Sequence, residues 1–277
     1  MENIYLFMLI AITVLAIADI IVGVSNDAIN FLNSAIGSKV LSLRTIMIVA
    51  SLGIFIGAVF SSGMMEVARK GIFVPAQFEF GEIMLIFMAV MITDILLLDF
   101  FNTLGLPTST TVSIVFNLLG AAVVMALIKI GAHDTQTFAD LGTYINKEKA
   151  ITIISGILLS VFIAFTVGAI VQWISRAIFT FNFEKKIKHF GVIFGGVALT
   201  AITYFIFLKG LKGTPYYSEL KEVLEGNEVF IIVGSFIFWT LFSVIFEKLT
   251  KKTVLLVVIA IGTFGLALAF SGNDLVN

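Results

Sequence analysis

The feature that most constrains this chain is a series of eight apolar stretches, each close to the length that crosses a lipid bilayer. A helix needs about 20 apolar residues to span the hydrocarbon core. Inside lipid every backbone amide must find its partner within the protein, and a helix meets that need by itself. We therefore expect an all-α polytopic membrane protein with about eight transmembrane segments, some of them broken or half helices. The expected spans cover residues 4–24, 43–63, 83–104, 108–130, 150–174, 190–208, 229–247 and 253–271.

Composition agrees with this class and limits the chemistry. Apolar residues make up 59% of the chain and charged residues only 13%, and the mean hydropathy is +1.10. So little charge is typical of multi-pass membrane proteins. The absence of cysteine excludes disulfides, thiolate metal sites and cysteine nucleophiles. We expect a multi-pass protein of the cell membrane, inner or plasma, whose partner is the lipid bilayer and not a nucleic acid.

A polar segment follows directly on the first apolar run. It reads Val-Ser-Asn-Asp-Ala-Ile-Asn over residues 24–30 and contains Asn26, Asp27 and Asn30. An unpaired carboxylate at membrane depth costs several kcal/mol, so such a residue usually belongs to a binding site or an ion path. The alternative is structural, with one residue capping a helix and the amides holding neighbouring helices together.

A second polar segment, Gly-Leu-Pro-Thr-Ser-Thr-Thr, covers residues 105–111. Pro107 cannot continue a preceding helix but suits the first turn of a new one. We therefore expect one helix to stop near Leu104 and another to start at about Thr108, with three hydroxyl side chains on its first turn. The alternative is a kinked helix whose hydroxyls bond to its own carbonyl groups. The three hydroxyl residues are Ser109, Thr110 and Thr111.

The pattern Asn-Asp-x-x-Asn occurs twice, at residues 26–30 and 273–277, each time at the end of an apolar span. An odd number of expected spans precedes the helix of the second copy, so the two copies cross the membrane in opposite directions. That arrangement is typical of inverted-repeat transporters. We expect a first repeat over residues 1–250 and the start of a second over 251–277, with the sequence ending inside its second signature.

Both segments resemble the signatures of the inorganic phosphate transporter (PiT) family. The first family motif reads Gly-Ala-Asn-Asp-Val-Ala-Asn and continues to Gly-Ser-Lys; the second reads Gly-Leu-Pro-Val-Ser-Thr-Thr-His. This sequence departs from them in Val24 and Ser25, which replace Gly-Ala, and in Val112, which stands where the family has histidine. The matching residues are Asn26, Asp27, Asn30, Gly37, Ser38 and Lys39, then Gly105 to Thr111, and at the C-terminus Gly272, Asn273, Asp274 and Asn277.

The resemblance implies transport of inorganic phosphate across a membrane, coupled to a sodium or proton gradient and needing no cofactor. Hydroxyls and the free N–H groups of a helix start would bind the phosphate at Ser109, Thr110 and Thr111. Oxygen ligands suit sodium, and a bound cation would neutralise the carboxylate so that an anion can enter. The expected cation ligands are Asn26, Asp27 and Asn30 in the first copy and Asn273, Asp274 and Asn277 in the second.

Other functions stay open at this point. The same hydroxyl-lined helix start could hold another oxyanion such as sulfate or arsenate. The chain could also be a non-transporting half or assembly subunit, acting as a homo-oligomer or with a second chain that carries the other half. An enzyme is not expected, because Asp27 and Asp94 lack the flanking residues of a protease dyad and no hydrolase motif occurs. Asp94 and Asp99 either take part in an ion path or are paired structurally.

Overall fold

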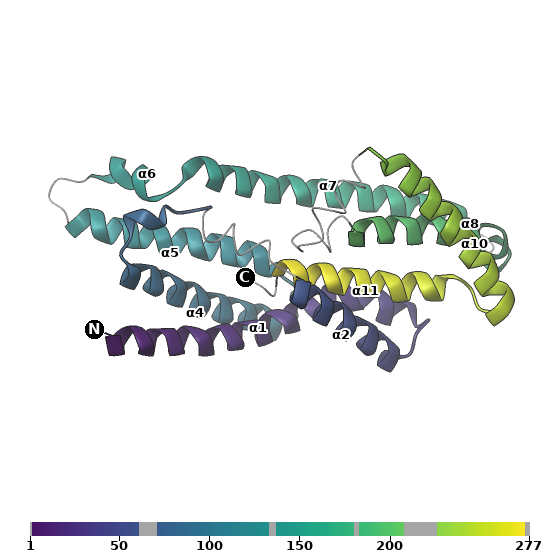
Figure 1. Cartoon of the computed structure of the whole chain (residues 1–277), viewed down its shortest axis with the longest axis horizontal. Coiled ribbons are helices and arrows are strands. Elements are labelled where there is room, and N and C mark those ends of the chain that lie inside the picture. The colour runs from purple at the N-terminus through teal and green to yellow at the C-terminus, as the bar shows by residue number, and fades with distance from the viewer. Residues whose placement is uncertain (1, 61–70, 133–136, 180–182, 208–225, 275–277) are drawn as a thin grey trace. The chain divides into compact units, whose positions relative to one another are not determined.

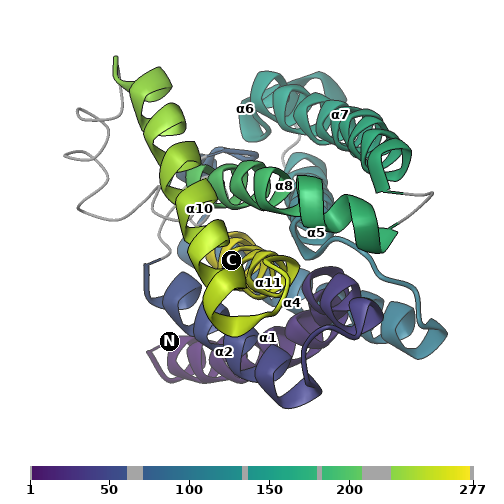
Figure 2. The same ribbon diagram turned by 90° about the vertical axis from the view of Figure 1, so that its right-hand side faces the viewer.

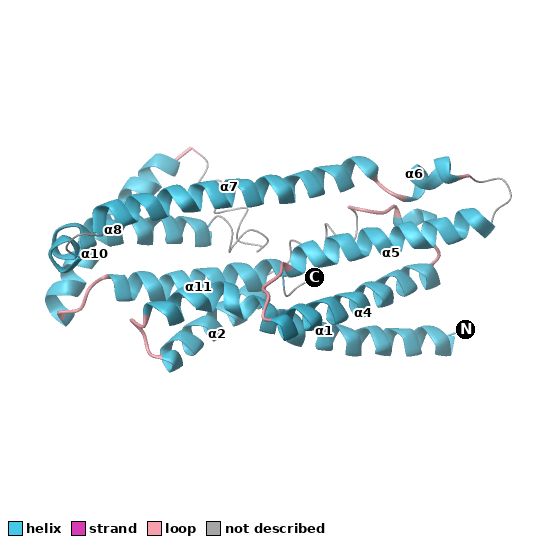
Figure 3. Ribbon diagram, turned by 180° about the vertical axis from the view of Figure 1, so that it is seen from behind, coloured by secondary structure: helices cyan, strands magenta, loops and turns pink. Residues whose placement is uncertain are grey.

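The computed structural model describes residues 2–60, 71–132, 137–179, 183–207 and 226–274 (Figure 1). The regular structure in those ranges is helical, apart from one isolated bridge between Phe73 and Ile145 (Figure 3). This confirms the all-α prediction. The elements are α1 (Glu2–Ser38), α2 (Leu43–Phe60), η1 (Pro75–Gln77), α4 (Phe80–Leu104), α5 (Thr110–Ala132), η2 (Phe138–Asp140), α6 (Leu141–Tyr144), α7 (Lys147–Phe179), α8 (Phe183–Phe205), α10 (Glu228–Thr250) and α11 (Leu255–Asp274).

Every expected span corresponds to one of these helices. Within the described residues, α1, α4, α5, α7 and α10 are long and apolar enough to cross a membrane, and α2, α8 and α11 contain shorter apolar helices. Several helices extend beyond the expected spans, most of all α1, which continues past residue 24 to Ser38, and α8, which begins at Phe183 instead of 190. The reason is that a helix ends at a cap or a breaker, not at the point where the apolar run ends.

The chain divides into two compact units. Unit 1 includes Met1–Asn30 and Gly63–Ser160, and unit 2 includes Phe31–Ser62 and Val161–Gly272. Helices α1 and α7 each contribute residues to both units, and the last residues of α11, from Asn273, belong to unit 1. This division is by contacts and not by repeats, so the expected repeat boundary near residue 250 stays a prediction.

In unit 1, the first part of α1 packs beside α4 in the same direction. The ring of Tyr5 meets the ring of Phe80 edge-on at 5.4 Å between centroids. About six turns further along both helices, the side-chain amide of Asn26 donates a hydrogen bond to Asn102 at 2.8 Å. The offset in residue number is almost the same for both contacts, which identifies a parallel pair with a constant register.

Helix α5 runs back against α4. At the far end of this hairpin Lys129 forms a 2.8 Å ion pair with Glu82, and both side chains are partly exposed. The apolar core of unit 1 lies along α4 and α5 and continues into the segments around η1 and α6. Its buried members are Ile72, Phe73, Phe78, Ile86, Val90, Val115, Leu118, Ala122, Ala126, Ile130, Tyr144 and Ile145.

In unit 2, helix α10 crosses α8 (Figure 2). Helix α2 approaches α11 closely at Gly53. A Cβ atom added at Gly53 of α2 would lie 2.7 Å from the carbonyl oxygen of Phe264 in α11. Beside it the hydroxyl of Ser271 donates to the carbonyl oxygen of Ile54 at 2.6 Å. The missing side chain of Gly53 is therefore what lets the two backbones meet, as small residues do in membrane helix pairs.

This contact generates a prediction about stability. Gly53→Ala should lower the melting temperature of the detergent-solubilised protein, because overpacking a close helix contact costs about 1–3 kcal/mol. Gly234→Ala in α10 is the matched control, since nothing lies within 4 Å of its added Cβ. Thermal unfolding followed by tryptophan fluorescence measures both. Equal melting temperatures for the two variants would contradict the close α2–α11 approach.

Candidate functional site

The break between α4 and α5 builds the centre of the candidate site. Helix α4 ends at Gly105, whose φ of 68° is left-handed and whose N–H donates to the carbonyl oxygens of Asn102 and Phe101. The N–H of Leu106 also returns to the carbonyl oxygen of Phe101, at 2.9 Å, which completes a glycine-terminated helix end. Pro107 then prevents the helix from continuing. The predicted stop at Leu104 is confirmed.

Helix α5 starts with Ser109 as its cap. The carbonyl oxygen of Ser109 accepts the first helical hydrogen bond, from the N–H of Ser113 at 3.0 Å. Its hydroxyl accepts from the N–H of Val112 at 3.3 Å, the bond that a serine cap normally makes. The first helical residue is therefore Thr110, two positions later than the sequence indicates, because Thr108 and Ser109 form the entry to the helix.

Asn26 fixes this helix start to α1. Its Oδ1 accepts from the backbone N–H of Thr108 at 2.9 Å, and its Nδ2 donates to Oδ1 of Asn102 at 2.8 Å. Asn102 in turn donates to the carbonyl oxygen of Val22 at 3.3 Å. Asn26 is only 1% exposed. A single buried amide thus joins three helices at the break.

Asp27 lies against the first turn of α5. Its Oδ2 accepts a 3.1 Å hydrogen bond from the hydroxyl of Thr110, and both residues are only 4% exposed. Gly23, one turn earlier on α1, packs against the same residue, since a Cβ there would make an ordinary van der Waals contact of 3.6 Å with the methyl carbon of Thr110. The carboxylate therefore lies beside the positive end of the α5 dipole, where negative charge is stabilised.

The remaining predicted residues are distributed as follows. Ser109 and Asn30 are exposed, and Thr111 is half-buried. In the second copy, Asn273 and Asp274 end α11, but their side chains lie outside the described part of the structure, as does the whole of Asn277. The structure thus brings together Asn26, Asp27 and the start of α5, and it leaves the second-copy residues as a prediction.

A polar cluster deeper in unit 1 was only partly anticipated. Asp94, left open between an ion path and structural pairing, is 1% exposed, and its Oδ1 accepts from the side chains of Ser113 and Asn117. Asp19 of α1 lies within hydrogen-bonding reach of Asp94. Sequence reasoning missed Asp19, although a carboxylate inside the first apolar run was itself a signal. Asp99, by contrast, is exposed.

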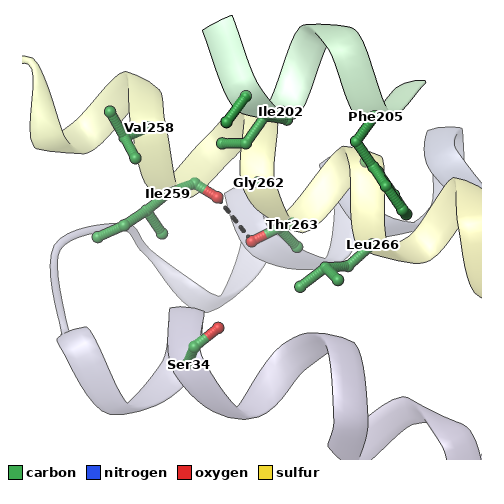
Figure 4. Close-up of a pocket in the computed structure, with 10 residues that line it drawn as sticks. Ser34, Ile202, Phe205, Val258, Ile259, Gly262, Thr263 and Leu266 are labelled. Carbon is green, nitrogen blue, oxygen red and sulfur yellow. Dashed lines mark hydrogen bonds between the residues drawn. The ribbon is translucent and has the colours of Figure 1, made fainter. Parts of the chain in front are cut away.

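Unit 2 contains a separate pocket of about 480 Å³, which Figure 4 shows. Its walls are mainly apolar side chains of α8 and α11, and its polar groups are the hydroxyls of Ser34 and Thr263. The Thr263 hydroxyl already donates to the carbonyl oxygen of Ile259 at 2.8 Å. None of the residues lining this pocket is charged, so it offers no compensation for a small anion, and the polar site in unit 1 is the stronger candidate.

Comparison with known proteins agrees with the motifs. A sequence model described as the phosphate transporter family matches residues 23–275. The chain belongs to the phosphate transporter family. The match includes the first Asn-Asp segment, the helix break, and Asn273 and Asp274 of the second segment. The geometry described above thus lies within the part of the chain that matches this family.

Relatives and a solved structure extend this result. A Pyrococcus furiosus protein, named provisionally as a phosphate permease, is 27% identical over 91% of this chain. A Bacillus subtilis protein, named provisionally as a low-affinity inorganic phosphate transporter, is 28% identical over 68% of this chain. The present chain spans 59% of the length of the Pyrococcus furiosus protein and 52% of the length of the Bacillus subtilis protein.

The structural likeness concerns the fold. A solved structure titled "The sodium-dependent phosphate transporter" superposes with a TM-score of 0.62 at 17% sequence identity, covering 97% of this chain and 76% of that one. The matched family is one of transporters and not of enzymes, and the long apolar helices of the described residues make the chain a multi-pass membrane protein. Its fold is shared along nearly its whole length.

The bridging amide generates a prediction about the assembly of the site. Asn26→Ala should destabilise the protein by about 1–3 kcal/mol, because it leaves the Thr108 N–H and the Asn102 amide without their partner. Asn33→Ala is the matched control, since Asn33 lies on the same helix and is exposed. The melting temperature in detergent measures the effect. A cost no larger than that of Asn33→Ala would show that the amide does not hold α5 in place.

Proposed function

We propose that this chain takes part in the cation-coupled symport of inorganic phosphate across the membrane. One observation carries the proposal: the carboxylate of Asp27 is hydrogen-bonded to Thr110 at the start of α5, so a cation ligand and an anion-binding helix start form one site. Membership of the phosphate transporter family and the names of its relatives support phosphate as the substrate.

The start of α5 supplies what an oxyanion needs. The first turn of a helix has backbone N–H groups without helical partners and carries the positive end of the dipole. The exposed hydroxyl of Ser109 and the hydroxyl of Thr111 would add donors there. The Thr110 hydroxyl, which donates to Asp27 in this structure, would turn to the phosphate once a cation occupies the carboxylate. Phosphate would thus be bound by neutral donors, without lysine or arginine. A site made of neutral donors binds the anion weakly enough to release it.

Asp27 makes anion binding depend on a cation. Its charge occupies the same helix end that phosphate would use, and two unit charges about 4 Å apart repel by roughly 4 kcal/mol at an effective dielectric of 20. A sodium ion on Asp27 removes this repulsion. Asn26 retains one lone pair on Oδ1, and Asn30 lies one turn further on, so both can complete the ligand set.

We propose sodium as the coupling ion at Asp27, with a proton on the same carboxylate as the alternative. In the second copy, Asn273, Asp274 and Asn277 would form a corresponding cation site. A second occupant of the anion site also follows from the chemistry, because hydroxyl and N–H donors do not distinguish one tetrahedral oxyanion from another. Arsenate or sulfate would compete with phosphate if the start of α5 recognises only the shape and charge of the anion.

Asp27 is tested by its effect on coupling. Binding of radiolabelled phosphate to the purified protein should rise with sodium by about 5- to 150-fold, the usual range for two coupled ligands. In Asp27→Asn this stimulation should disappear, because no charge remains for sodium to neutralise, and concentrative uptake into proteoliposomes should be lost. Asp99→Asn, which changes an exposed carboxylate, is the control. Sodium stimulation that survives in Asp27→Asn would refute the assignment.

The proposed phosphate-binding hydroxyls at the start of α5 are tested separately. The double variant Ser109→Ala/Thr110→Ala should weaken phosphate binding by roughly 10- to 100-fold per lost charge-assisted bond. Ser160→Ala/Thr166→Ala is the matched control, because both of its hydroxyls bond to carbonyls of their own helix, α7. Competition with arsenate and sulfate in the same assay defines the selectivity. Binding without uptake in the unaltered protein would instead favour a non-transporting half or assembly subunit.

A further inference from the structure

A second carboxylate site lies along the same three helices, beyond Asp27. Asp94 is 1% exposed, and its Oδ1 accepts hydrogen bonds from the hydroxyl of Ser113 and from Nδ2 of Asn117, the latter at 3.0 Å. Asn117 also donates to the Ser113 hydroxyl at 3.2 Å, which orients that group toward Asp94. One oxygen of Asp94 therefore has the surroundings of an ionised carboxylate.

The other oxygen of Asp94 faces a different environment. Its Oδ2 and the Oδ1 of Asp19 are buried, and neither receives a hydrogen bond from another residue in the described ranges. The parallel register of α1 on α4, set by the Tyr5–Phe80 and Asn26–Asn102 contacts, places the two carboxyl groups next to each other. A hydrogen bond between them forms only if one group carries a hydrogen atom. Two ionised carboxylates at that separation would repel by roughly 4 kcal/mol even at an effective dielectric of 20.

Within the described helices α1, α4 and α5, no basic side chain is placed to compensate the charge of the pair. Asp94 lies ten residues before Leu104, the end of the 25-residue helix α4, which is roughly 15 Å along the helix axis and close to the middle of a span. The lysine that α5 contributes, Lys129, is paired with Glu82 at the other end of the hairpin. The charge of the pair must therefore be balanced by a small cation.

We propose that Asp19 and Asp94 form a buried proton-binding pair, in which Asp94 is the ionised member and Asp19 carries the proton. The ligand set favours a proton over sodium. The amide nitrogen of Asn117, not its oxygen, faces Asp94, and the Ser113 hydroxyl donates to it, so few oxygens remain for a metal. A proton needs only the two carboxyl oxygens that face each other.

Other titratable groups on these helices are few. Asp27 on α1 is near enough to act on Asp94 through charge. Asp99 on α4 is exposed, and Glu82 is paired with Lys129 of α5. A proton on the pair removes a negative charge close to Asp27 and would thereby ease anion entry at the start of α5. The proton site itself stands whether or not the proposed phosphate transport is correct.

Infrared spectroscopy of the purified protein tests the pair directly. A protonated buried carboxyl group gives a carboxylic C=O band that shifts in D₂O and disappears at alkaline pH. The unaltered protein should show this band, and Asp19→Asn should lose it. The amide is an isostere of the neutral carboxyl, so this variant should keep its fold. The band should persist in Asp99→Asn and in Asp27→Asn, which separates it from the exposed carboxyl and from the proposed cation site.

Two further outcomes decide the assignment. Asn117→Ala removes a donor to Asp94 and should shift the band without abolishing it. A band that survives unchanged in Asp19→Asn would overturn the proposal, as would a band that sodium abolishes at constant pH, since sodium would then be the occupant. The measurement requires neither phosphate nor transport, so a negative result here leaves the phosphate tests independent.

Discussion

Unit 1 depends on one constraint: a carboxylate inside a membrane helix bundle must find hydrogen-bond donors or a cation. Asp27 receives the Thr110 hydroxyl and lies at the positive end of α5, and Asp94 receives two side-chain donors. In both cases the donors come from α5. The break between α4 and α5 therefore does more than reverse the chain. It places the positive start of α5 beside the buried carboxylate of α1, which needs hydrogen-bond donors.

Much of this architecture could be predicted from the sequence, because the signals are local. Apolar length identified the spans, and Gly105 with Pro107 identified the break. The meeting of the Asn-Asp segment with the hydroxyl segment could be expected only through the family resemblance. The hydrogen bond from Thr110 to Asp27 shows how the two segments meet.

Other features could not be predicted, because they depend on register between distant helices. Asp19 looks like one polar residue in an apolar run, and nothing local indicates that Asp94 faces it from 75 positions away. The role of Asn26 as a link to Thr108 likewise depends on the α1–α4 packing. The close approach at Gly53 has the same origin, since a glycine in an apolar helix does not reveal which backbone it will meet.

The register itself connects the two carboxylate sites. Tyr5 meets Phe80, Asp19 meets Asp94 and Asn26 meets Asn102, so one parallel alignment of α1 with α4 makes all three contacts. Apolar packing in lipid barely distinguishes one register from the next, because every neighbour is apolar. The buried polar pairs do distinguish them, since a shift by one turn would leave an amide and a carboxyl without partners at once. The groups assigned to ion binding thus also hold α1 and α4 in place, and a change in the charge of either carboxylate acts on the packing of the same helix pair.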